Sequence, residues 1–199
     1  STAGEGAAGF NVRGGSTDQN LMLLDNAVIY NPSHFFGIFQ ALNPFTTKDV
    51  KILKGGIPAE YGGRLSSVFD ITSKDANTEK IAGEAAIGPV TSNVALEIPV
   101  VKGKSGLLIG GRGTYSGWIL RSLEEESLQN SEASFYDAIA KYTHKFNEKN
   151  TVKAMGYYSN DAFSITSDSI YGYNNRLFSL QWDHQFNEKN TGSLILANS

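Results

Sequence analysis

The side chains best suited to chemistry are two histidines in matching positions, His144 and His184, and the acidic run Glu124, Glu125 and Glu126. Imidazole and carboxylate groups could hold a metal ion or transfer a proton. No second ligand lies at metal spacing from either histidine, so we interpret both as turn-flanking residues at an interface. The acidic run fits a solvated loop, with a weak cation contact as the alternative. The sequence shows neither a nucleophile with its base nor a paired-carboxylate site. We therefore predict that the protein has no metal site and is not an enzyme.

Two short motifs suggest nucleotide chemistry, but both lack the context that such chemistry needs. Residues 4–9 match the glycine pattern of dinucleotide-binding loops, yet no strand precedes them and no helical periodicity follows. The single Arg-Gly-Gly at 13–15 has no neighbouring repeats. The net charge of −3 and the pI near 5.6 provide no broad basic field. We therefore expect no nucleic-acid partner and no cofactor, and the lack of cysteine excludes disulfide and thiolate chemistry.

The two histidines belong to a repeat that indicates how the chain is built. Residues 144–155 and 184–195 share His, one position that differs (Lys145 or Gln185) and then Phe-Asn-Glu-Lys-Asn-Thr, and the second copy lies 40 positions after the first. Each copy places a polar Asn-Glu-Lys-Asn turn between alternating segments. The repeat predicts one unit laid down twice: a long strand, a tight turn, a long strand back and a large loop.

Apolar and polar side chains alternate along the segments that lead into both turns. Successive side chains of a strand point to opposite faces, so the alternation predicts one apolar and one polar face. The apolar set comprises Ala138, Ala140, Tyr142, Phe146, Phe178, Leu180, Trp182 and Phe186, and the polar set includes Lys141, Gln181 and Asp183.

A soluble antiparallel sheet and a transmembrane β-barrel both fit this alternation. The segments run to about 10 residues, whereas soluble strands usually have about 5 or 6. Tight turns alternate with long polar loops at 119–133 and 159–174, as expected when one rim faces the periplasm and the other faces outside. Aromatic residues lie near strand ends, as in the girdles of a membrane barrel. These are Trp118, Phe146, Tyr157, Tyr158, Tyr173 and Phe186.

We expect seven antiparallel strands in the second part of the chain. Their expected ranges are 81–88, 92–100, 106–118, 134–146, 151–159, 175–186 and 191–198. An open sheet of this kind would leave unpaired edges in lipid, where backbone polar groups must be satisfied. We therefore expect the sequence to be part of a longer protein.

The first 76 residues differ in character from the rest. They are rich in Gly and Asn and carry short strand-like runs at 21–24, 50–53 and 68–71. Glycine pairs separate these runs, which suits tight turns or close approach of the backbone. The charged, turn-like run at 73–77 marks a boundary. We predict one domain at 1–76 and a second at 77–199.

A resemblance to a known family is carried by several motifs in order. They are Asn-Val-Arg-Gly-Gly at 11–15, Asp-Gln-Asn-Leu-Met-Leu-Leu-Asp at 18–25, Tyr-Asn-Pro-Ser-His-Phe-Phe-Gly at 30–37 and Lys-Asp-Val-Lys-Ile-Leu-Lys-Gly-Gly-Ile-Pro-Ala-Glu-Tyr-Gly-Gly-Arg at 48–64. These resemble the second half of the plug domain of TonB-dependent outer-membrane receptors, above all those of Bacteroidota. Leu-Glu-Ile-Pro at 96–99 and Gly-Gly-Arg-Gly-Thr-Tyr at 110–115 resemble the first barrel strands of the same family.

The resemblance implies an all-β fold: a transmembrane antiparallel β-barrel, here about seven strands, with the C-terminal part of a mixed plug domain in its lumen. The TonB box, the first half of the plug and most of the roughly 22 strands of such transporters are absent from this sequence. Glycan importers of the family carry a different motif after Lys-Asp, and this departure argues against a polysaccharide substrate and a lipoprotein lid.

The family's upward-facing plug loops correspond to residues 13–15, 30–32 and 60–62 of this sequence. The resemblance therefore implies that solute binds Arg13, Tyr30, Asn31, His34 and Tyr61 at the plug apex. Arg13 would offer a donor fork to an anionic or carbonyl-rich solute. The tyrosines would offer flat amphipathic surfaces. The alternative for Arg13 is a buried pairing with a carboxylate.

Contacts between plug and barrel are expected at Arg64 on the plug and at Glu84, Glu97 and Arg112 on the barrel. The three barrel residues lie on the polar faces of the first strands, so they point into the lumen if the apolar faces meet lipid. A charge in a water-filled lumen is tolerated, whereas a basic residue on the lipid face at midplane costs about 2–4 kcal/mol.

Two functions from different classes follow from the resemblance. The first is TonB-dependent uptake of a bulky scarce solute, siderophore-like or another nutrient, across the bacterial outer membrane. The alternative is a non-transporting plugged barrel that serves as a receptor or as a structural subunit of an outer-membrane assembly or export complex. The partners implied are outer-membrane lipid, a TonB-type energy-coupling protein, the solute, and a lipoprotein or other subunit of such a complex.

Overall fold

The computed structural model describes residues 20–30, 33–34, 39–40, 43–54, 67–115, 132–164 and 171–199. Strands and turns account for this part of the chain, and it forms two main sheets and one small hairpin. No helix among the described residues is long and apolar enough to cross a membrane.

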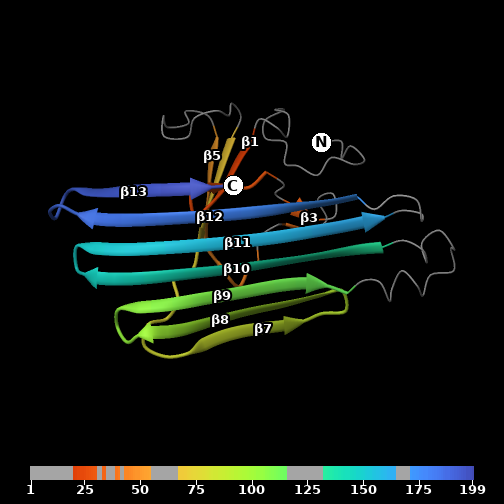
Figure 1. The fold of residues 1–199 in the computed structure, drawn as a ribbon, viewed down its shortest axis with the longest axis horizontal. Helices are drawn as coiled ribbons and strands as arrows, with labels where there is room; N and C mark the ends of the chain where they lie inside the picture. Colours follow the sequence, from red (N-terminus) through yellow and green to blue (C-terminus); the bar gives the residue numbers. More distant parts are fainter. Residues whose placement is uncertain are drawn as a thin grey trace.

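The larger sheet, called the wall sheet below, contains seven strands in sequence order, each antiparallel to the next (Figure 1). The strands are β7 (Ala82–Ile87), β8 (Thr91–Val101), β9 (Ser105–Thr114), β10 (Glu132–Asn147), β11 (Asn150–Ser164), β12 (Tyr171–Gln185) and β13 (Thr191–Asn198). The predicted number, order and direction of the strands are confirmed.

Three wall strands are longer than the alternation indicated. β10 has 16 residues, and β11 and β12 have 15 each. The prediction of a loop at 159–174 was wrong, because β11 and β12 stay paired as far as Phe163 and Tyr171. Polar residues such as Asn160 and Asn174 resemble a loop in the sequence, but the ladder needs only their backbone groups, which pair with each other.

Both repeated turns are closed by the side chain of their first asparagine. Asn147 Oδ1 accepts bonds from the Lys149 backbone N–H at 2.9 Å and from Asn150 Nδ2 at 2.9 Å. Asn187 Oδ1 does the same in the second copy. The two turns lie at the same end of the wall sheet, as predicted (Figure 1).

The smaller sheet, called the plug sheet below, has the order β2-β1-β6-β5. Its strands are β1 (Asn20–Leu24), β2 (Ala27–Val28), β5 (Thr47–Lys54) and β6 (Ser67–Ser73), and β3 (Ser33–His34) pairs with β4 (Phe39–Gln40) beside it. β1 runs parallel to β6 and the other pairs are antiparallel. A mixed plug domain with strands at 21–24, 50–53 and 68–71 was predicted, and β1, β5 and β6 include these ranges. The boundary at residue 76 stays a prediction.

The plug sheet packs against one face of the wall sheet and crosses its strands steeply (Figure 1). Buried side chains of both sheets form a single core between them. They are Met22, Leu24, Ala27, Ile29 and Ile71 from the plug side and Ile139, Met155, Tyr157 and Leu177 from the wall. The opposite face of the wall leaves Phe178 and Trp182 about half exposed. The two faces therefore differ as the alternation predicted, with Gln181 on the plug side.

Candidate functional site

The most unusual feature of the interface between the two sheets is a buried lysine from the wall. The Lys141 side chain on β10 is only 3% exposed. Its ammonium group lies 3.2 Å from Asp75 Oδ1 and 3.5 Å from Asp25 Oδ2, and it donates to the Ser73 carbonyl at 3.0 Å. All three partners lie in residues 20–76, so one wall cation binds three acceptors across the interface. A buried cation needs such partners to offset its lost hydration.

Asp25 is held in place by the tight turn between β1 and β2. Asp25 and Asn26 have φ of 44° and 69°, as expected for a two-residue hairpin turn of type I′, where Asp and Asn tolerate left-handed backbone. The Asp25 carboxylate also accepts bonds from the Ser73 backbone N–H, at 3.0 Å, and from the Ser73 hydroxyl. The carboxylate thus fastens β6 to the turn before it meets Lys141.

Asp75 completes the cluster from the segment that follows β6. Its Oδ1 atom also accepts a bond from the Thr143 hydroxyl at 3.0 Å. Burial by itself would raise the pKa of Asp75, but the ammonium groups of Lys141 and Lys153 and the bonds from Lys141 and Thr143 outweigh burial. The pKa of Asp75 is therefore lowered from its ordinary value of 3.8.

A second chain of polar contacts lies beside this cluster. Asn26 Nδ2 donates to Gln181 Oε1 at 3.1 Å, and Gln181 Nε2 donates to Asp183 Oδ1 at 2.7 Å. Asp183 also lies 3.5 Å from Lys153 Nζ. A cavity of about 180 Å³ separates the two sheets here, lined by polar residues including Asp25, Lys153 and Gln181. The interface is therefore close-packed at its apolar core and open at its polar side.

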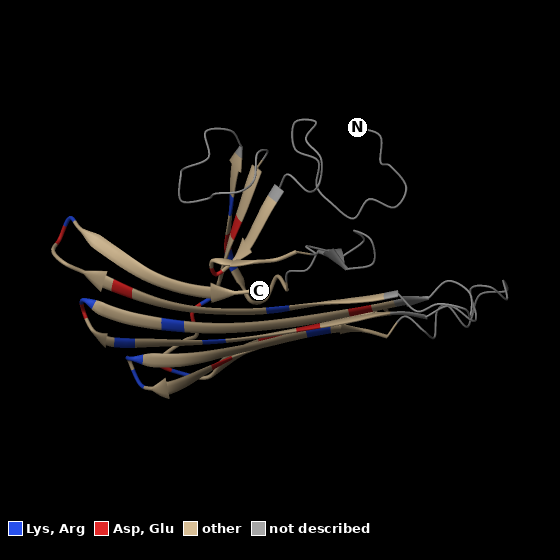
Figure 2. Cartoon of the chain, turned by 45° about the horizontal axis from the view of Figure 1, so that its top comes forward, with Lys and Arg blue, Asp and Glu red and all other residues tan. Residues whose placement is uncertain are grey.

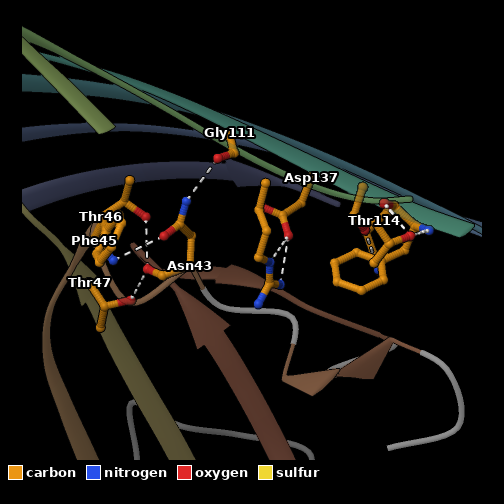
Figure 3. A network of polar contacts seen from close by, with 11 residues as sticks. Asn43, Phe45, Thr46, Thr47, Gly111, Thr114 and Asp137 are labelled. Atoms are coloured by element: carbon orange, nitrogen blue, oxygen red, sulfur yellow. Dashed lines mark hydrogen bonds and ion pairs between the residues drawn. The ribbon is translucent and has the colours of Figure 1, made fainter. Parts of the chain in front are cut away.

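On the other side of the core, the turn that precedes β5 docks on β9 (Figure 3). The buried Asn43 side chain accepts a bond from the Phe45 backbone N–H at 3.0 Å, and its Nδ2 donates to the Gly111 carbonyl at 3.3 Å. The Thr46 and Thr47 hydroxyls both donate to the Asn43 carbonyl, at 3.1 and 3.0 Å. Asn43 thus organises the turn and attaches it to the wall.

The three predicted wall contacts have different partners. Glu84 lies 3.1 Å from Lys74 Nζ, in a pair that remains solvent-exposed. Glu97 Oε2 accepts a bond from the Asn77 backbone N–H at 2.7 Å, in the segment that joins the two sheets.

Arg112 pairs within the wall. Its guanidinium on β9 lies 2.6 Å from the Asp137 carboxylate on β10, and both side chains are buried. The guanidinium also lies over the Phe135 ring, 5.0 Å from the centroid. Asp137 lines the small cavity beside Asn43 and Thr46, so the pair braces the wall where the plug turn docks.

Of the predicted apex residues, the structure gives a side-chain environment for Tyr30 alone. Tyr30 is 64% exposed and lines a pocket of about 300 Å³ with Asn174, Asn175 and Arg176 of β12. His34 lies on β3. Arg13, Asn31, Tyr61 and Arg64 lie outside the described residues.

Sequence reasoning missed the residues that meet at the centre of the interface. Lys141 was placed on the polar face but was not singled out, and Asp25 and Asp75 were noted only as members of a motif and of the boundary run. A usable signal existed: a lysine in the middle of a long strand needs a carboxylate partner if the strand faces a packed domain. Among the described residues, no group of three or more His, Cys, Asp or Glu side chains could hold a metal ion.

Comparisons with known proteins agree with this architecture. Residues 1–67 match the family model described as the TonB-dependent Receptor Plug Domain. A mutant of the ferric enterobactin receptor from Pseudomonas aeruginosa has a similar structure, with a TM-score of 0.63 at 10% identity, over 91% of this chain and 32% of that one. No curated protein matches the sequence.

The chain spans about a third of the length of that receptor, and the likeness shows the fold. Neither match bears on the Bacteroidota type. Residues 1–67 thus match the plug domain of the TonB-dependent receptors, and over most of its length, including the seven-stranded wall sheet, the chain shares the fold of that receptor.

Proposed function

We propose that the protein takes up a bulky, scarce solute across the bacterial outer membrane in a TonB-dependent manner. The family match of the plug and the shared fold support the general activity. The observation that carries the proposal is the interface around Lys141, where a folded plug sheet is attached to the inner face of the wall by polar contacts beside a cavity.

Such an interface suits a domain that must shift and then return. Separating two apolar surfaces in water costs free energy in proportion to the area exposed. A buried ion pair, in contrast, contributes little net stability, because water compensates the charges once they separate. The contacts of Lys141 with Asp25 and Asp75 therefore specify where the plug sits and add little to the work of moving it. In this proposal an energy-coupling protein of the TonB type supplies that work.

We further propose that solute is captured at the plug apex by Arg13, Tyr30, Asn31, His34 and Tyr61. The exposure of Tyr30 and the pocket that it shares with β12 support this position. The receptor with the similar structure is named for ferric enterobactin. A ferric siderophore is therefore the first probe to use.

The test uses the complete protein in its own bacterium. Uptake of ferric enterobactin and of a ferric hydroxamate, both labelled with radioactive iron, is compared between wild-type and gene-deleted cells. We expect loss of uptake of one probe in the deleted strain, restoration on complementation, and abolition by a protonophore. If uptake of both probes is unchanged and an outer-membrane complex is lost from the deleted strain, the transport function is wrong and the structural-subunit function is supported instead.

A further inference from the structure

The repeated hairpins carry the same set of rings on the exposed face of the wall, next to their turns. In the first copy, the His144 ring lies 4.4 Å from that of Phe146, in an edge-to-face arrangement. In the second copy, the corresponding distance from His184 to Phe186 is 4.6 Å. Both phenylalanines are about 60% exposed, at 60% and 63%. The repeat therefore maintains an exposed aromatic edge together with a turn.

A third ring extends each set toward the middle of the strand. Tyr142 lies 6.1 Å from His144, and Trp182 lies 5.9 Å from His184. Asn150 Oδ1 accepts bonds from Trp182 Nε1, at 3.1 Å, and from His184 Nδ1, at 2.8 Å. Because Asn150 also closes the first turn, the orientation of the second set of rings is tied to that turn.

Lysines accumulate on the turns at the same end of the wall sheet, as Figure 2 shows at the left of the view. Five exposed lysines lie on these turns and on the segment before β7, namely Lys80, Lys102, Lys104, Lys149 and Lys189, and a sixth, Lys145, lies near the end of β10. The exposed carboxylates of the same turns and segment are Asp75, Glu79, Glu148 and Glu188. None of the six forms a salt bridge with a carboxylate in the described part of the chain. The chain as a whole has a net charge of −3, so this positive excess is local.

We infer that this rim, formed by the six lysines and the two ring sets, binds the headgroups of anionic glycerophospholipids. The inference rests on the proposed function, since it requires the wall to span a membrane. Rings of this kind gather at the interfaces of membrane barrels, where apolar ring faces meet the acyl chains and polar ring atoms meet the headgroups. Lysines on the adjoining turns then lie at the phosphates. An anionic surface attracts each nearby lysine by an amount equivalent to roughly fivefold in affinity.

The experiment measures which lipid lies against the rim. The full-length protein is reconstituted into phosphatidylethanolamine vesicles that contain brominated phosphatidylglycerol, brominated phosphatidylethanolamine or brominated lipid A at equal fraction. Bromine quenches the fluorescence of nearby tryptophans. The quenching that is lost in Trp182→Phe is that of Trp182 and therefore reports the lipid at the rim. We expect phosphatidylglycerol to quench Trp182 more than the other two lipids do. Lys149→Gln with Lys189→Gln should lower that preference by roughly fivefold or more.

Matched variants on the same turns control for structure. Lys149→Arg with Lys189→Arg keeps the charge and should keep the preference, whereas Glu148→Gln with Glu188→Gln should keep or raise it. Equal quenching by phosphatidylglycerol and phosphatidylethanolamine, or a stronger effect of lipid A, would overturn the headgroup assignment alone. The absence of Trp182 quenching by any brominated lipid would instead overturn the membrane location on which the proposed function depends.

Discussion

Thr46 of the plug occupies the space into which a side chain at Gly110 of the wall would extend. A Cβ atom at Gly110 would overlap Cγ2 of Thr46 and would lie 3.0 Å from Cγ2 of Ile139. At Gly106, on the same strand, a Cβ atom would lie 2.9 Å from Cβ of Ala76. The absence of side chains at these two positions therefore sets how closely the plug approaches β9.

Replacing Gly110 by valine should loosen the plug. Overpacking of this kind costs about 1–3 kcal/mol and requires Thr46 or the plug turn to move. Cells that carry Gly110→Val in the complete protein should become more sensitive to vancomycin, which is too large for an intact plugged barrel. Gly156→Ala is the control, because nothing lies within 4 Å of a Cβ atom there. Equal sensitivity of the two variants would show that Gly110 does not set the fit of the plug.

Removing the ammonium group of Lys141 should destabilise the plug more than removing that of Lys153. Lys141→Met removes the cation that contacts both Asp25 and Asp75, and breaking a buried pair costs about 3 kcal/mol or more. Lys153 is 27% exposed, so Lys153→Met should cost about 1 kcal/mol or less. Limited proteolysis of the plug in the purified protein measures the difference.

Neutralising the acids should partly rescue the Lys141 variant. Asp25→Asn with Asp75→Asn removes the two uncompensated carboxylates, so the triple variant should resist protease better than Lys141→Met alone. If the triple variant is cleaved as fast as the single one, the effect of Lys141→Met arises from lost packing and the ionic explanation is wrong.

Acidification should weaken the attachment of the plug through Asp75. The pKa of Asp75 is lowered in the folded protein, so its charged form stabilises the fold at pH values above the ordinary 3.8. This stabilisation is lost as the pH falls from about 4 through the lower folded-state pKa. The melting temperature of the wild type should therefore fall more steeply below pH 4 than that of Asp75→Asn. If the melting temperatures of the two proteins change with pH in parallel over about 3.5 units, from about pH 2.5 to about pH 6, this contribution of Asp75 is excluded.

The two faces of β12 should respond differently to arginine. Leu180 lies on the face opposite the plug, and an arginine there should cost about 2–4 kcal/mol near midplane. Gln181 faces the plug and donates to Asp183, so Gln181→Arg should disturb the interface and spare barrel assembly. The heat-modifiable folded band of the outer-membrane fraction reports assembly. Comparable folded fractions for both variants would contradict a membrane-spanning β12.

Loss of the apex side chains should weaken solute binding without affecting the barrel. Tyr30→Ala removes an exposed aromatic surface, typically worth about 1 kcal/mol, and Arg13→Ala removes a charge-assisted bond of about 1.5–3 kcal/mol. Together they should weaken binding of ferric enterobactin, or of whichever ferric probe the wild type takes up, by at least about tenfold. Titration of purified protein measures this. Unchanged affinity of a correctly folded double variant would assign binding to other loops.

Sequence alone determined the strands and their faces. The repeat of His and Phe-Asn-Glu-Lys-Asn-Thr located two hairpin turns, and period-two alternation assigned Phe178 and Gln181 to opposite faces. These features are local: a turn needs its asparagine and a strand its alternation, whatever else the chain does. For the same reason the polar stretch around Asn160 was misread as a loop, because a backbone ladder continues where side-chain patterning stops.

Only the tertiary structure decided which polar residues meet. Lys141 and Asp25 are 116 positions apart, and no local rule relates them, since their contact depends on how steeply the plug sheet crosses the wall. Arg112 shows the same limit. Its face was predicted, but its pairing with Asp137 follows from the β9–β10 register, in which the two residues are direct neighbours. Strand registers and sheet crossing angles depend on packing over whole sheets, so the type of a single residue does not predict them.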